Sequence, residues 1–293
     1  MVLLAPFTPT AYFLIDLESR SSLNKRWISS RPLWFRCPRF FRIVWIFFRI
    51  ALGPFQKRWL FDPSQIRAVL LVRDLYSTLN PLLDQLLRQG IKAQNIYLID
   101  AGSTSSACLE QLASMKQRGF RTIHLSAPHQ NYGPYALWMC SYLNREMRSW
   151  NYPYLVTDTD LEFPPNVPDD WLLELFTALN HYGCISKASL PLQVSDITVE
   201  NRSVIRAHER ALVHSRPYRI FSKFLLNATS STAICTTDTT FSLYRPSMFF
   251  STFSLRLSSC YSLKHLPWYS DFCLSQEYRY YQQHKSPLFG EWS

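Results

Sequence analysis

Two aspartates in the stretch "YLVTDTDLEFPP", residues 154–165, have the type and spacing of a cation site. Asp158 and Asp160 stand one residue apart, where an apolar run gives way to a proline-broken loop. In an extended chain residues i and i+2 point to the same side, so both carboxylates are expected to face one spot. Two unpaired carboxylates so close repel each other, and a hard divalent cation relieves the repulsion. An EF-hand is excluded, because its loop needs Gly at the sixth position, where Phe163 stands.

Short apolar runs that alternate with helical patterns are expected to hold these aspartates in place. The runs predicted as buried strands cover residues 66–74, 95–100, 122–127 and 154–160. The stretches predicted as helices cover residues 77–90, 101–119 and 135–147. In the first of these, leucines recur at helical spacing until Gly90 ends the helix. This alternation predicts β-α-β crossovers and a mostly parallel sheet.

The chain therefore divides into a regular and an irregular part. Residues 62–175 are predicted to form a doubly wound α/β half. After residue 175 the pattern is less regular: "FSLYRP" (241–246) indicates a strand and "SQEYRYYQQH" (275–284) a helix, so residues 176–293 are predicted to form a mixed half. Neither G-x-G-x-x-G nor a P-loop motif is present, so a Rossmann dinucleotide site and a P-loop site are not expected.

Polar residues follow the predicted strands at the point where each strand ends. They are Arg73 and Asp74, Asp100 with the small residues after it, the Asn131-Tyr132-Gly133 loop, and Asp158 with Asp160. In an open parallel sheet, ligands bind beyond the carboxyl ends of the strands, so these side chains are expected to share one rim. Asp100 suits a ribose or a base, because an ionised carboxylate only accepts hydrogen bonds. Two plainer readings stay open: Asp100 caps the following helix, and the Asn131 loop is an ordinary turn.

The net charge of +10 comes from one segment. No acidic residue lies between Glu18 and Asp62, and ten basic residues stand there, while the other 21 basic residues are balanced by all 21 acidic ones. We therefore expect a basic, aromatic N-terminal arm over residues 1–61 and a nearly neutral body over residues 62–293. A neutral body argues against nucleic acid as a partner. Seven scattered cysteines without a C-x-x-C pair argue for a reducing compartment and against structural zinc.

The arm contains one amphipathic segment, "RFFRIVWIFFRIAL", residues 39–52. A helical projection gathers its aromatic and aliphatic residues on one side and Arg39, Arg42 and Arg49 on the other. It is too short and too charged to span a bilayer. Two readings stay open: a helix lying in an anionic membrane interface, or a helix that packs its aromatic face on the body. The predicted location is the cytoplasm, either free or peripheral on the inner face of the plasma membrane.

The order of the motifs "VLLVRD", "IYLIDAGSTS", "NYGPYALW", "YLVTDTDLEFPP" and "TDTTFSLYRP" resembles glycosyltransferases of the GT-A fold, in particular bacterial family 2-like enzymes with a D-x-D motif. The resemblance runs from about Val69 to Trp292. It implies an α/β, GT-A-like fold in which residues 176–293 bind the acceptor. It also implies a nucleotide-sugar donor, most simply a UDP-sugar, a saccharide or lipid-linked acceptor, and Mn²⁺ or Mg²⁺ as cofactor.

The resemblance also assigns roles to residues. The nucleotide contacts become Arg73, Asp100, Asn131 and Asp158. The metal ligands become Asp158, Asp160 and His265. The chemistry needs the cation, because the sugar leaves its nucleotide as a diphosphate whose growing charge is neutralised in place. For His265 a satisfied structural histidine stays open as the plainer reading.

An inverting transfer also needs a base that takes the proton of the acceptor hydroxyl. Asp238 in "TDTTF" is the first candidate, followed by Asp271 and Glu277. The chain lacks the E-D pair that marks the base in many family 2 enzymes, so inversion and retention both stay open. Trp268 and Tyr269 either stack on a sugar face or pack in the core.

Two other classes of function compete with glycosyl transfer. Nucleotidyltransfer uses a similar sheet and paired carboxylates, but the loop "VRDLYSTLN" has no Gly-rich, lysine-bearing sequence. The other alternative is non-catalytic: a degenerate transferase body that carries the basic arm as a membrane- or nucleic-acid-binding module.

Overall fold

The computed structural model describes residues 57–126, 136–183, 185–214, 233–236, 241–246, 253–257 and 262–285. The α-helices are α4 (Leu79–Arg88), α5 (Ser106–Gln117), α6 (Ala136–Met139), α7 (Ser141–Arg148), α8 (Trp171–His181), α9 (Arg202–His214), α11 (Ser270–Cys273) and α12 (Gln276–His284). The strands are β1 (Arg67–Val72), β2 (Ile96–Asp100), β3 (Arg121–His124), β4 (Tyr154–Asp158), β5 (Leu161–Glu162), β6 (Lys187–Ser189), β7 (Ala233–Thr236), β8 (Ser242–Tyr244), β9 (Phe253–Arg256) and β10 (Lys264–His265). Short 3₁₀ turns are η3 (Pro63–Gln65), η4 (Ala93–Asn95) and η6 (Leu266–Trp268).

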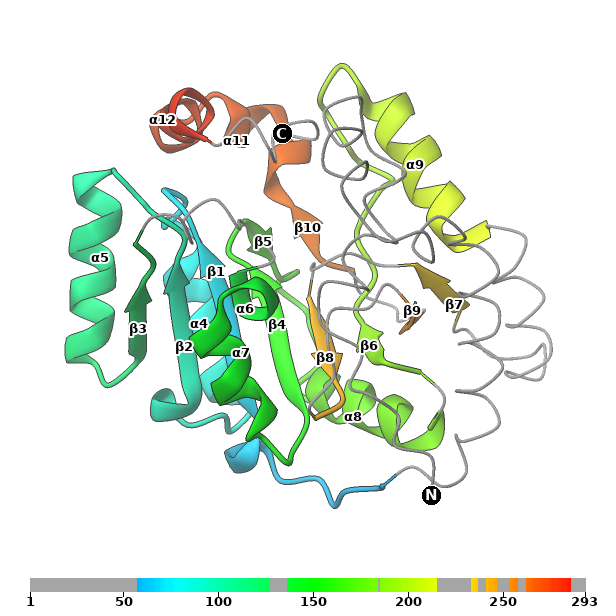
Figure 1. Ribbon diagram of the computed structural model, residues 1–293. Coiled ribbons are helices and arrows are strands. Elements are labelled where there is room, and N and C mark those ends of the chain that lie inside the picture. Colours follow the sequence, from blue (N-terminus) through cyan, green and yellow to red (C-terminus); the bar gives the residue numbers. More distant parts are fainter. Residues whose placement is uncertain are drawn as a thin grey trace, which may run out of the picture.

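An eight-stranded sheet in the order β3-β2-β1-β4-β8-β6-β9-β7 forms the centre of the fold (Figure 1). β1 is parallel to both β2 and β4, and β2 is parallel to β3. β8 enters antiparallel between β4 and β6, and β7 is antiparallel to β9. The sheet thus has a parallel half and a mixed half, which confirms the predicted α/β class. A separate two-stranded ribbon pairs β10 with β5 in antiparallel fashion.

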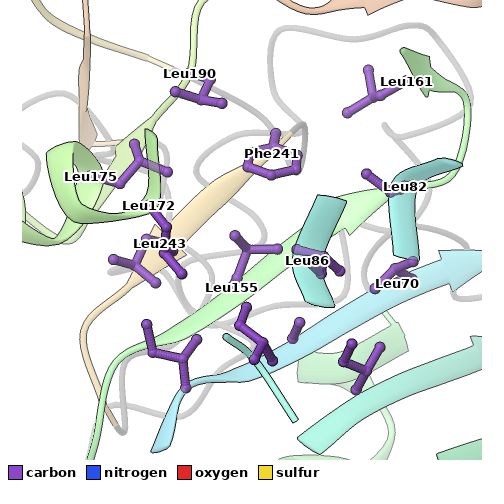
Figure 2. Close-up of a cluster of buried hydrophobic side chains, with 14 of the residues drawn as sticks. Leu70, Leu82, Leu86, Leu155, Leu161, Leu172, Leu175, Leu190, Phe241 and Leu243 are labelled. Atoms are coloured by element: carbon purple, nitrogen blue, oxygen red, sulfur yellow. The ribbon is translucent and has the colours of Figure 1, made fainter. Parts of the chain in front are cut away.

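Helices cover both faces of the parallel half, because its strands are apolar on both sides. Alternate residues of β1 face different cores: Leu70 packs with the leucines of α4 and α8, and Val69 packs with α6 and α7. Figure 2 shows the first of these cores, with Leu70, Leu155 and Leu243 of three neighbouring strands against leucines of α4 and α8. The doubly wound arrangement follows directly from this two-sided apolar pattern.

Two of the three predicted helices end close to where the sequence predicts, and the third is divided into two helices. α4 ends at Arg88, and Gly90 follows in the left-handed region at φ +86°, where a Cβ atom would lie 3.0 Å from Cγ of Pro63. α5 ends at Gln117, two residues before Gly119 at φ +93°. The third helix, expected as one piece over residues 135–147, is interrupted at Cys140, which has the extended backbone of an N-cap and separates α6 from α7.

Trp59 and Phe61, which precede the predicted body, already pack on it. The backbone N–H of Trp59 donates to Asn180, its indole N–H donates to the carbonyl of Asn151, and the ring of Phe61 lies edge-on to Phe176. The predicted division between arm and body at residues 61 and 62 stays a prediction, and these contacts indicate Lys57 as the safer point for a truncation. Within the described residues, no helix is long and apolar enough to cross a membrane.

Candidate active site at the carboxyl ends of the parallel strands

The parallel half of the sheet has a topological switch point between β1 and β4. From β1 the chain proceeds to β2 and β3 on one side and returns with β4 on the other side of β1. At such a point the connections leave in opposite directions, and the crevice beyond the carboxyl ends of the two strands is where open α/β sheets bind ligands. β1 ends next to Arg73 and Asp74, and β4 ends at Asp158. Arg73, Asp74, Asp100 and Asp158 therefore lie at the expected edge, and the Asn131 loop lies outside the described residues.

The D-x-D segment meets the C-terminal part of the chain at the ribbon of β5 and β10. His265 pairs with Leu161 in the ribbon, and its Nε2 lies 3.4 Å from Oδ2 of Asp160. The other carboxylate oxygen of Asp160, Oδ1, is buried and has no hydrogen-bond partner among the described residues. A buried, ionised oxygen without a partner is costly, so this position is suited to a bound cation.

The side chains described around Asp160 are too few to enclose a cation by themselves. Within the described part of the chain, no three His, Cys, Asp or Glu side chains gather closely enough to enclose a metal ion by themselves. Asp160 and His265 offer one oxygen and one nitrogen, a mixture that suits Mn²⁺ better than Ca²⁺. Asp158, half-buried at the end of β4, lies two residues away. Divalent ions in nucleotide sites ordinarily take further ligands from phosphate and water.

His265 also has a packing role. Its ring lies edge-on to Trp268 with 4.8 Å between the ring centroids. Trp268 is buried in a small cluster with Ile197 and Ile205, and the hydroxyl of Tyr269 donates to Asp196 at 2.7 Å. These two aromatic residues therefore follow the packing alternative rather than presenting free ring faces to a sugar.

Asp100 holds the turn that follows β2. Its Oδ1 accepts hydrogen bonds from the backbone N–H groups of Gly102 and Ser103, at 3.2 and 2.7 Å, and its Oδ2 lies 2.9 Å from Nδ1 of His124. The N-cap of α5 is Ser105, so Asp100 orders the turn before the helix without capping it. The predicted nucleoside contact through Asp100 stays a prediction.

Asp74 is a buried carboxylate to which the sequence assigned a place on the rim but no role. Its Oδ1 accepts from the backbone N–H groups of Thr104 and Ser105, at 2.7 and 2.8 Å, and its own N–H donates to Ser103. It adopts φ +54°, an uncommon conformation for a residue with a side chain. Four successive N–H groups, residues 102–105, thus point at Asp100 and Asp74. The sequence signal was an Asp directly after a buried strand.

The thiol beside these two carboxylates is not a nucleophile. Burial raises the pKa of Cys108 to about 11, and the nearby charges of Asp100 and Asp74 act in the same direction. Because only the thiolate attacks, Cys108 is inert at neutral pH.

Of the remaining predicted site residues, two contact other parts of the chain, one is exposed, and two lie outside the described residues. Arg73 donates to the carbonyl of His284 at 3.1 Å and so contacts α12. Glu277 accepts from the backbone N–H groups of Tyr76 and Ser77, the latter at 3.0 Å, and Asp271 is exposed on α11. Asn131 and Asp238 lie outside the described residues.

Comparison with known proteins gives matches to solved structures alone. No protein-family model and no curated protein matches the chain. One matched structure is the mannosyltransferase PcManGT from Pyrobaculum calidifontis in complex with GDP-Man and Mn²⁺, with 14% identity over 53% of this chain and 45% of that chain, at a TM-score of 0.34. Another is TarS (residues 1–349) of S. aureus, with 12% identity over 69% and 60% of the two chains, at a TM-score of 0.41.

A third match is glucosyl-3-phosphoglycerate synthase from Mycobacterium tuberculosis in complex with Mn²⁺, UDP-glucose and phosphoglyceric acid. Its identity is 15% over 68% of this chain and 60% of that chain, at a TM-score of 0.36. The chain thus spans 45–60% of the length of these three matched chains. All three TM-scores lie below 0.5, so we infer nothing about the activity of this chain from the matches.

Proposed function

We propose that this protein is a metal-dependent glycosyltransferase that moves a sugar from a nucleotide-sugar donor, a UDP-sugar in the simplest case, to a saccharide or lipid-linked acceptor. The observation that carries the proposal is Oδ1 of Asp160, which is buried, has no hydrogen-bond partner in the described part of the chain, and lies beside His265 two residues after β4. It stands at the switch point of the sheet, where a ligand is expected. Such a carboxylate is suited to holding a cation against the donor diphosphate.

Each part of the rim has a task in this proposal. Asp158, Asp160 and His265 would bind Mn²⁺ or Mg²⁺ together with phosphate oxygens and water, because these side chains do not enclose an ion by themselves, and the bound ion would stabilise the leaving diphosphate. The turn ordered by Asp100 and Asp74 shapes the nucleoside side of the crevice, with Asn131 and Arg73 as further contacts. Asp238 accepts the proton of the acceptor hydroxyl if the transfer inverts configuration. The acceptor binds against residues 176–293.

A donor panel tests the proposed function. Purified full-length protein is incubated with UDP-, GDP- and dTDP-sugars and Mn²⁺, and release of the free nucleoside diphosphate is measured. We expect release with one nucleotide class, its loss with excess chelator, and its return with added Mn²⁺ or Mg²⁺. Release of inorganic pyrophosphate from a nucleoside triphosphate and a sugar phosphate would instead support nucleotidyltransfer. Absence of turnover and of nucleotide binding would support the non-catalytic alternative.

For the arm we propose attachment to an anionic membrane surface, at the inner face of the plasma membrane. All ten unbalanced positive charges lie in residues 20–58, and each basic residue near an anionic leaflet contributes about 1 kcal/mol. A transferase acting on a lipid-linked acceptor gains from being held at that surface. The amphipathic segment, residues 39–52, lies outside the described residues.

Vesicle flotation tests this attachment. The full chain is compared with a chain that begins at Lys57, which keeps the contacts of Trp59 with the body. We expect the full chain to float with anionic vesicles at low salt, to float less as salt rises, and the truncated chain to remain in solution. A full-length variant with Arg39, Arg42 and Arg49 replaced by Glu is the matched control for charge. Equal flotation of all three proteins would contradict the proposal.

A further inference from the structure

The C-terminal helix α12 lies across the rim of the proposed donor site. Figure 1 shows α11 and α12, in red, beyond the edge of the sheet at which β1 and β2 end. Three polar contacts dock the helix there. Glu277 accepts from the N–H groups of Tyr76 and Ser77, Tyr280 donates to Thr104 at 3.1 Å, and the carbonyl of His284 accepts from Arg73 at 3.1 Å. The contacts lie at the first turn, the middle and the last residue of the helix.

The contact of Glu277 differs from the other two, because it reaches backbone N–H groups in the loop after β1. Residues 73–78 between β1 and α4 have no ladder partner, so the N–H groups of Tyr76 and Ser77 depend on the carboxylate. A carboxylate that accepts from backbone N–H groups forms charge-assisted bonds, which are stronger than neutral ones. Glu277 therefore holds the loop after β1 against α12.

The same loop holds the middle residue of the D-x-D motif. The hydroxyl of Thr78 donates to the carbonyl of Thr159, and the hydroxyl of Thr159 donates to the carbonyl of Leu75 at 3.2 Å. Thr159 is 3% exposed, so these reciprocal bonds satisfy buried groups. They join the loop after β1 to the segment that carries Asp158 and Asp160.

The residues that lead into α12 also contact the D-x-D segment. The carbonyl of Asp160 accepts from the N–H of Leu266 at 2.9 Å, directly after His265 in β10. The D-x-D segment thus contacts both the loop after β1 and residues 264–266, and Glu277 of α12 joins the C-terminal part of the chain to that loop.

We propose that Glu277 is a positioning residue that orders the D-x-D segment for cation and donor binding, in place of the base role that the sequence left open for it. The proposal rests on the proposed transferase function. Oε1 of Glu277 accepts from two backbone N–H groups of the loop after β1, and this contact holds the carboxylate against the loop. Removal of the Glu277 carboxylate frees the loop at residues 75–78. Thr159 and the two flanking aspartates then lose the support of this loop.

Hydrogen exchange in the full-length protein tests the coupling without any need for turnover. In Glu277→Ala we expect amide exchange to speed up about tenfold at residues 75–78 and also at residues 157–162, the change expected from losing a charged hydrogen bond. Glu277→Gln keeps an acceptor oxygen without the charge and is expected to fall in between; it replaces the alanine variant if that one unfolds. Glu110→Ala, on the exposed side of α5, is the matched control and should exchange like the wild type. Faster exchange at residues 75–78 alone would overturn the proposal and leave Glu277 as an anchor for α12.

Metal dependence separates positioning from base catalysis. Because Tyr280 and His284 still dock α12, we expect Glu277→Ala to need about tenfold more Mn²⁺ for half-maximal transfer, with kcat at saturating Mn²⁺ close to that of the wild type. Loss of a base would lower kcat at every Mn²⁺ concentration and leave the Mn²⁺ requirement unchanged, which would overturn the positioning role. If the wild type transfers no sugar from any donor, the proposed function fails, while hydrogen exchange and Mn²⁺ binding followed by tryptophan fluorescence still decide the coupling.

Discussion

Asp160→Asn and Asp158→Asn are each expected to lower the rate of sugar transfer about 10³-fold while leaving the fold intact. Asparagine keeps the size of the side chain and one oxygen, but it removes the negative charge that attracts the cation. Because Oδ1 of Asp160 is buried without a hydrogen-bond partner among the residues that the structure describes, this position is the more sensitive of the two for cation binding. The fold should persist, because removing one of two neighbouring like charges relieves repulsion in the absence of metal.

The measurement is kcat/KM for the donor identified by the panel, together with the thermal unfolding midpoint of each variant. Asp169→Asn is the matched control, because Asp169 is exposed in the loop before α8. Wild-type activity should disappear with excess chelator and return with Mn²⁺ or Mg²⁺. Full activity of either variant under excess chelator would show that the two aspartates hold no catalytic metal.

Asp238→Asn is expected to lower transfer by about 10²–10⁴-fold without weakening donor binding, since a base acts on the acceptor and not on the nucleotide sugar. Asp238 lies outside the described residues, between the end of β7 at Thr236 and the start of β8 at Ser242. Its assignment rests on the sequence, where an acid flanked by threonines borders an apolar run.

Two further carboxylate variants serve as comparison. Asp271→Asn changes an exposed residue of α11 and is expected to have little effect. Glu277→Gln is expected to change the Mn²⁺ requirement instead of kcat. Donor affinity is measured by isothermal titration, and transfer by product formation. Should Asp238→Asn bind donor and turn over normally, the base is another residue or the enzyme retains configuration.

The parallel half of the fold was predictable from the sequence for a local reason. Buried strands such as 67–72 read as continuous apolar runs, and the leucines of α4 recur at the spacing of one helix face, so neither pattern depends on distant residues. The rule that ligands bind beyond the carboxyl ends of parallel strands then predicts that Asp74, Asp100 and Asp158 share one rim.

Only the tertiary structure decided which of these residues are engaged with the protein itself. Asp100 accepts from the N–H groups of its own turn, and Glu277 accepts from the N–H of Ser77, 200 residues away along the chain, while their predicted roles toward a substrate stay predictions. The contact of His265 with Asp160 likewise depends on the pairing of β10 with β5. Such contacts form when packed elements bring together loops that are distant in the sequence. The periodicity of residues along the chain carries no information about which distant loops meet.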